Sequence, residues 1–203
     1  MSGRRSASVL LLAALAGCGH KAVRYAAADL PARMPASVAV MPFDNLSTDV
    51  DAPKVVRGVV ERDLAATGLS VRPVEGTDEA LRAIGVTDGG QLKAYAPADL
   101  ARAVGADGLL YGSVESFQIQ NLGVYVRRTV VVRLTLVEGA SGEKLWEAEG
   151  KGSSQSFARP QHAGREFVRE LVQDALSKMT GKVLAAEAEK AVFAALAEMP
   201  RRY

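Results

Sequence analysis

The feature that most constrains the fold is a long run of strand-forming residues from 124 to 137. Apolar residues alternate along its second half with polar ones such as Arg133 and Thr135. Because successive side chains of a strand point to opposite faces, this alternation predicts a strand with one face in the core. Residues 138–142 form a turn pattern, and residues 144–149 return as a strand that carries Trp146. The expected core-facing residues are Val130, Val132, Leu134 and Leu136.

Strand patterns and helix patterns alternate upstream of this hairpin. The strand patterns are short apolar runs, and they cover residues 37–43, 69–74 and 109–119. The helix patterns start at a residue that favours a helix N-terminus and stop at a glycine; they run from Pro53 to Gly68, from an N-cap at Thr77 to Gly85, and from Pro97 to Gly105. Residues 150–159 are small and polar and predict a loop, after which a helical pattern runs from Gln161 to Met199. This order predicts one α/β domain, a mixed β-sheet of about five strands packed by helices, over residues 37–199.

The N-terminus has the pattern of a bacterial export signal. Arg4 and Arg5 precede an apolar run of about ten residues, which is too short to span roughly 30 Å of hydrocarbon. The run ends in Leu-Ala-Gly-Cys, with the cysteine at position 18. This sequence resembles the lipobox of bacterial lipoproteins, in which cleavage falls before the cysteine, here between Gly17 and Cys18. The resemblance implies that residues 1–17 are a signal peptide and that Cys18 carries a diacylglycerol and an acylated amino group.

Two other interpretations of this segment stay open. Cys18 could be a chance cysteine after an ordinary secretory signal, or a free buried thiol. The Arg4-Arg5 pair could belong to a twin-arginine signal, although no apolar pair follows it. Under the lipoprotein interpretation, residues 18–36 are the lipidated cysteine and a tether that extends to about 60 Å. Gly19 stands where lipoproteins retained in the inner membrane often carry aspartate, which favours the outer membrane and a periplasm-facing domain.

Composition excludes several kinds of partner and cofactor. Removal of residues 1–17 leaves 23 basic and 23 acidic residues, so we expect no nucleic-acid partner. One cysteine excludes an internal disulfide, and one cysteine with two histidines leaves almost no ligands for a structural zinc site. We therefore expect no cofactor and no metal. The expected membrane contact is the lipid on Cys18, which the lipobox resemblance implies.

The sequence also lacks a recognisable catalytic set. Residues 139–142 and 150–154 fit neither a nucleophile elbow nor a phosphate-binding loop. His162 has no second histidine in the predicted domain, so a surface role outweighs catalysis. Trp146 is expected to pack in the hairpin. The remaining candidates form an acidic cluster that lacks the glycine of a calcium loop. Turn formation and helix capping before Pro53 are its favoured roles; the cluster consists of Asp44, Asn45, Asp49 and Asp51. The chain is accordingly expected not to be an enzyme.

Three stretches resemble a bacterial lipoprotein family of unknown function that is related to CsgG-type curli-secretion lipoproteins and to the TolB amino-terminal fold. They are Val38 to Asn45 (VAVMPFDN), Gly105 to Glu115 (GADGLLYGSVE) and Leu134 to Glu147 (LTLVEGASGEKLWE). The resemblance covers roughly residues 37–150 and implies a TolB/CsgG-like fold. The long pore-forming strands of CsgG have no counterpart, which disfavours a secretion channel.

Two functions stay open at this point. The first is a non-enzymatic accessory subunit of an envelope transport or assembly complex, which binds other envelope proteins. The second is a lipid-anchored regulator of a peptidoglycan synthase, a role disfavoured by a tether of only about 18 residues. Homo-oligomer formation is a further hypothesis, with the apolar run Val130 to Val132 as an unpaired strand edge.

Overall fold

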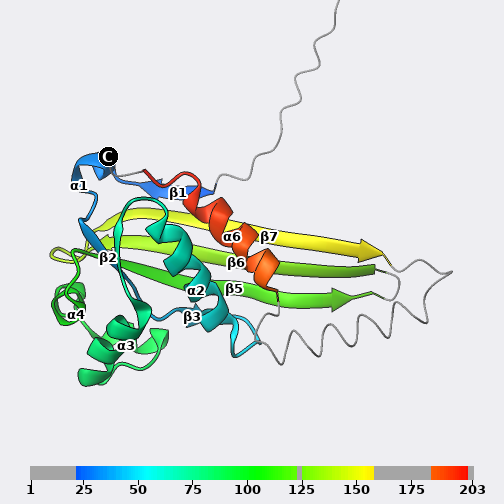
Figure 1. Ribbon diagram of the computed structural model, residues 1–203, viewed down its shortest axis with the longest axis horizontal. Coiled ribbons are helices and arrows are strands. Elements are labelled where there is room, and N and C mark those ends of the chain that lie inside the picture. Colours follow the sequence, from blue (N-terminus) through cyan, green and yellow to red (C-terminus); the bar gives the residue numbers. More distant parts are fainter. Residues whose placement is uncertain (1–21, 123–124, 158–183, 201–203) are drawn as a thin grey trace, which may run out of the picture.

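The computed structural model describes residues 22–122, 125–157 and 184–200. A seven-stranded mixed sheet runs in the order β1-β7-β6-β5-β2-β4, and β3 pairs with β5 outside this path. Figure 1 shows long strands side by side at the centre of the sheet, with helices lying across them and others beside one end of the sheet. The strands are β1 (Val23–Ala26), β2 (Ser37–Val40), β3 (Asp44–Asn45), β4 (Ser70–Arg72), β5 (Gly108–Asn121), β6 (Tyr125–Glu138) and β7 (Lys144–Phe157). The helices are α1 (Leu30–Arg33), α2 (Ala52–Ala65), α3 (Val74–Ala83), the 3₁₀ helix η1 (Gly89–Ala94), α4 (Pro97–Val104) and α6 (Ala185–Leu196).

The expected α/β fold is confirmed, and the sheet has seven strands where about five were predicted. The two extra strands are β1 and β3. Both are short, and their residues are mostly polar or exposed, so no apolar alternation marked them in the sequence. In the part of the chain that the structure describes, no helix is long and apolar enough to cross a membrane.

The parallel half of the sheet places helices on opposite faces. β2 lies between β4 and β5 and runs parallel to both. Val38 and Val40 pack into one core together with α2 and α6. Ala39 and Met41 point to the other face and pack with α3 and α4. Every apolar residue of this short strand is therefore buried, as expected for a strand with helices on both sides.

The antiparallel half consists of the short strand β1 and of the long strands β7, β6 and β5, each of which has 14 residues. The predicted core face of β6 is confirmed, because its four alternating apolar residues are fully or almost fully buried. β6 pairs with β5 on one side and with β7 on the other. The idea that Val130 to Val132 forms an unpaired edge is therefore wrong, and self-association stays a prediction without that edge.

Residues 150–157 continue strand β7, so the predicted loop over residues 150–159 is wrong for this part. Their small side chains serve a close approach of α6 to the sheet. A Cβ atom at Gly150 would lie 1.8 Å from the carbonyl oxygen of Ala191, and one at Gly152 would lie 1.8 Å from that of Glu187. Glycine at these two positions therefore permits helix packing and does not mark a flexible segment.

The three predicted helices upstream are present, with one start displaced. α3 begins at Val74, so Thr77 is a buried residue of its second turn and not an N-cap. The Thr77 hydroxyl donates a hydrogen bond to the carbonyl oxygen of Pro73 at 3.1 Å. α4 begins at Pro97 and ends before Gly105, which has a φ of 65°, as its sequence signals predicted. α6 confirms part of the predicted C-terminal helix, and residues 158–183 lie outside the described residues.

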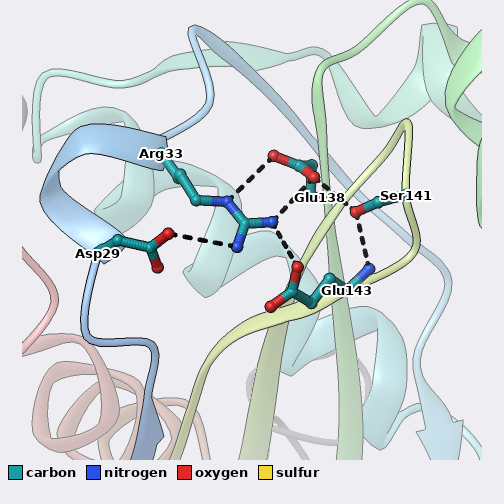
Figure 2. A network of polar contacts seen from close by, with 5 residues as sticks. All are labelled: Asp29, Arg33, Glu138, Ser141 and Glu143. Atoms are coloured by element: carbon teal, nitrogen blue, oxygen red, sulfur yellow. Dashed lines mark hydrogen bonds and ion pairs between the residues drawn. The ribbon is translucent and has the colours of Figure 1, made fainter.

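The segment expected to be a tether is largely folded. β1 pairs with β7, and Leu30 of α1 is buried. Arg33 then binds the turn between β6 and β7, as Figure 2 shows: its guanidinium lies 2.9 Å from Glu138 and 2.8 Å from Glu143. Hydrogen bonds from Arg33 and Ser141 lower the pKa of Glu138. The prediction of a tether through residue 36 is therefore wrong from Val23 onward, because backbone pairing and this polar network hold the segment on the sheet. Neither interaction leaves a periodic pattern in the sequence.

Candidate functional site

A groove of about 970 Å³ opens where β2 and β3 end, between α2, the start of α3 and η1. The chain leaves β2, passes through α2 and returns as β4 on one side, whereas β5 flanks β2 on the other side. Carboxyl ends of parallel strands at such a change of direction are the usual place of binding sites in α/β proteins. The groove is thus the first candidate for a functional site in the described residues.

The floor of the groove is held by Arg57 of α2, which is buried. Its Nε and Nη2 atoms donate hydrogen bonds to the carbonyl oxygen of Val40 at 3.2 and 2.7 Å. Its Nη1 atom lies 2.7 Å from Oδ1 of Asp78 in α3. One side chain therefore connects the end of β2 with the two helices that form the groove walls.

The wall formed by η1 is fixed by a close backbone contact. A Cβ atom at Gly89 would lie 2.6 Å from the carbonyl carbon of Phe43, so only glycine fits there. Asp88 and Gln91 form a capping box at the start of η1. Lys93 pairs with Asp44 across the wall at 3.0 Å. These contacts make the wall a preformed surface.

The rim of the groove carries two exposed apolar side chains, Leu46 at 64% and Val50 at 87% exposure. The turn between them is rigid, because Asn45 Nδ2 donates to the carbonyl oxygen of Asp49 at 2.8 Å and Asn45 Oδ1 accepts from the amide of Ser47 at 3.0 Å. The predicted turn role is confirmed for Asn45 and Asp49 by these bonds and by the Asp51 amide, which donates to Asp49 Oδ1 at 3.0 Å. The predicted capping role is wrong for the Asp51 side chain, which makes no cap hydrogen bond at the start of α2, and Asp44 lies in β3. The turn presents apolar surface to solvent, which favours contact with another molecule.

The charges of the groove are unequal. Carboxylates outnumber cations in its lining: the acids are Asp44, Glu61, Glu75, Asp78 and Asp88, and the bases are Lys54, Arg57 and Lys93. Most of these acids already have a partner within the fold; Glu61, for example, accepts a hydrogen bond from the amide of Val74 at 2.8 Å. Glu75, which is exposed in the first turn of α3, adds negative charge to the groove lining. A segment with basic and apolar side chains would complement this groove.

The other residues singled out in the sequence lie elsewhere. Trp146 is fully buried, which confirms the packing role. Gly17, Cys18 and His162 lie outside the described residues. Within residues 22–122, 125–157 and 184–200, no three His, Cys, Asp or Glu side chains converge on a metal position. Of the groove, sequence analysis found only the turn; the role of Arg57 had no sequence signal, because a single arginine on a helix normally faces solvent.

We expect Arg57→Met to lower the free energy of unfolding by about 2 kcal/mol, because it leaves the buried Val40 carbonyl without two donors. Arg62→Met is the matched control on the same helix. Arg62 is exposed, so the loss of its ion pairs with Asp63 and Glu189 should change stability by no more than about 0.5 kcal/mol. Urea unfolding of both variants measures the difference, and equal stabilities would contradict the structural role of Arg57.

Comparison with known proteins gives consistent matches. A family model described as "Putative lipoprotein GNA1162-like" matches residues 25–199. "Putative lipoprotein NMB1124/NMB1162" of Neisseria meningitidis serogroup B (strain MC58) is 28% identical over 127 residues, which are 60% of this chain and 59% of that relative's length. The crystal structure of lipoprotein GNA1162 from Neisseria meningitidis matches with 25% identity and a TM-score of 0.57, over 70% of this chain and 100% of that one.

A weaker structural likeness extends beyond these proteins. The PelC dodecamer structure from Paraburkholderia phytofirmans has 19% identity and a TM-score of 0.48, and the match covers 79% of this chain and 85% of that one. The expected resemblance to a lipoprotein family is confirmed by the family model, and the wider relation to CsgG-type and TolB amino-terminal proteins stays a prediction.

Proposed function

Because the chain belongs to the GNA1162-like lipoprotein family, we propose that it is a lipid-anchored, non-enzymatic accessory subunit of an envelope transport or assembly complex. The lipid is attached to Cys18, and the folded domain faces the periplasm from the outer membrane. The single observation that carries the proposal is the preformed acidic groove with the apolar rim of Leu46 and Val50, which fits a segment of a partner protein.

The folded N-terminal segment supports a role close to the membrane. β1 begins at Val23, five positions after Cys18. An extended chain spans at most about 3.6 Å per residue, so a link of this length reaches roughly 18 Å. A lipid on Cys18 would keep the sheet beside its own membrane. This reach disfavours the alternative, a regulator that crosses the periplasm to a peptidoglycan synthase.

The use of the groove side chains supports a binding role over a catalytic one. Asp78 pairs with buried Arg57, Asp44 pairs with Lys93, and Asp88 belongs to the capping box of η1. A general acid or base must lie within hydrogen-bond reach of the substrate and must have a pKa near the working pH. These three carboxylates instead bind other side chains and backbone groups of the groove walls, and they thereby stabilise the shape of the groove.

Photo-crosslinking from the groove tests the proposal in cells. A photoreactive phenylalanine analogue is placed at Leu46 or Val50 of the full-length chain, and Phe193 of α6, which is 71% exposed, is the control position. We expect the same adduct from both rim positions and not from Phe193, and mass spectrometry should identify a component of an envelope transport or assembly complex. A peptidoglycan synthase in the adduct would instead support the alternative, and no adduct from either rim position would contradict the groove.

A charge variant makes this test specific to the groove. We expect Glu75→Lys to reduce the adduct from Leu46 at least fivefold, a loss equivalent to about 1 kcal/mol in the contact of a basic segment. Glu79→Lys is the matched control, because Glu79 is also exposed on α3 but does not line the groove. An equal effect of both variants would show that net charge, and not the groove, decides the contact.

A further inference from the structure

The far end of the β5–β7 strands carries an apolar and aromatic tip. Leu122, directly after β5, is 69% exposed, and Phe157 at the end of β7 is 71% exposed. The rings of Tyr125 and Phe157 lie 5.1 Å apart across the β6–β7 pair. In Figure 1 this end of the three strands extends past α2 and α6, so these helices do not cover the tip.

Among the described residues, the charges near this tip are all positive. Described residues 116–121, 125–132 and 151–157 contain no acid, and their charged residues are Arg127, Arg128 and Lys151. On the packed helix α6, Glu187 is buried and accepts a hydrogen bond from the Ser154 hydroxyl. On the sheet, Glu115 and Glu149 lie further from the tip and both contact Arg133. The tip therefore has a basic border that no described carboxylate neutralises.

The aromatic and basic residues share one face. The register pairs Tyr125 with Phe157, and Val131 with Lys151. These residues alternate with Val130 and Gly152, which face α6. Tyr125, Phe157, Lys151 and Arg127 consequently lie on the sheet face opposite α6. We call these four residues the tip face.

We propose that the tip face lies on an anionic phospholipid surface and is a second membrane contact beside the lipid on Cys18. The inference rests on the lipid anchor of the proposed function. Aromatic rings favour the level of the headgroups, and each basic residue near an anionic surface strengthens binding about fivefold. Exposed rings beside cations that no described carboxylate neutralises are the combination that favours binding to an anionic lipid surface.

The length of the N-terminal link fixes how the sheet would lie. Ala22 accepts a hydrogen bond from the amide of Glu149, so the chain joins β7 eight residues before Phe157. Eight strand residues span about 27 Å, whereas the four positions from Cys18 to Ala22 reach only about 14 Å. Both contacts are therefore compatible only if the strands lie obliquely along the membrane, with the tip face toward it, and not upright.

A depth probe on the lipidated protein tests this contact. Phe157→Cys is labelled with an environment-sensitive fluorophore in the purified full-length lipoprotein, whose only natural cysteine is Cys18. The protein is reconstituted in vesicles of phosphatidylcholine with 30% phosphatidylglycerol or of phosphatidylcholine alone, with a spin-labelled lipid as quencher. Phe193→Cys on α6 is the matched control, because it has the same exposure and lies on the opposite face.

We expect a blue shift and quenching at position 157 on anionic vesicles, with little of either at position 193. In an Arg127→Gln, Lys151→Gln double variant, the ratio of docked to free tip should fall about 25-fold, with an unchanged circular dichroism melting curve. The proposal would be overturned by a probe at position 157 that stays exposed to solvent, or by equal quenching on neutral vesicles. It would also be overturned if the probe were shielded only in whole envelopes, by a partner protein and not by lipid.

The lipid anchor and the membrane contact of the tip face can be tested separately. Flotation with vesicles in high salt reports the lipid on Cys18, because salt screens the basic residues. Flotation without quenching at 157 would overturn the tip contact alone. Absence of flotation would overturn the lipid anchor. The tip contact would then be tested by binding of the unlipidated protein to anionic vesicles at low salt, and lack of binding would overturn it.

Discussion

We expect Gly152→Val to lower the free energy of unfolding by at least about 3 kcal/mol, because overpacking against a backbone cannot be relieved by a rotamer change. A Cβ atom at this position would lie 1.8 Å from the carbonyl oxygen of Glu187 and 2.8 Å from the amide nitrogen of Ala191. α6 would have to move away from β7 and expose Val192 and the other apolar residues that it buries. Urea unfolding, followed by circular dichroism, measures the loss.

The same protein offers matched controls for this substitution. Gly58 in α2 and Gly76 in α3 have no atom within 4 Å of a Cβ position. Gly58→Ala and Gly76→Ala should therefore raise stability by about 0.5–1 kcal/mol, because alanine favours a helix interior over glycine. A Gly152→Val protein as stable as these variants would contradict the close packing of α6 on the sheet.

We expect Cys18→Ser to abolish lipidation and signal cleavage, because lipoprotein processing requires the cysteine sulfur to carry a diacylglycerol before the chain is cut. The product should be a precursor that keeps residues 1–17 and lacks the acyl mass. It should also disappear from the outer-membrane fraction, because two or more acyl chains are what make membrane attachment lasting. Intact-protein mass spectrometry of the membrane fractions measures both effects.

Gly19→Ala is the control for this prediction, since it changes the neighbouring residue and keeps Leu15 to Cys18 intact. This variant should be cleaved and acylated normally. A Cys18→Ser protein with normal cleavage and normal membrane distribution would contradict both the lipid anchor and the oblique orientation inferred from its short link.

Sequence patterns predicted the central strands and the upstream helices well, because each depends on local periodicity. The alternation in β6 follows from one buried face, and α4 follows from Pro97 and Gly105 at its ends. The same logic misplaced the start of α3, where Thr77 resembled an N-cap but lies buried inside the helix. An N-cap residue is defined by its non-helical backbone conformation, and the residue type alone does not fix that conformation.

The sequence by itself determined the class of the fold, the buried face of the long strands and the lipoprotein pattern around Cys18, because these are local in the chain. Only the tertiary structure decided the role of residues far apart: Gly150 and Gly152 accept a helix that begins more than 30 residues later, and Arg33 binds a turn more than 100 residues away. The groove depends likewise on Arg57 meeting Val40 and Asp78. Such contacts have no period or spacing in the sequence, since the distance between the partners is set by the fold.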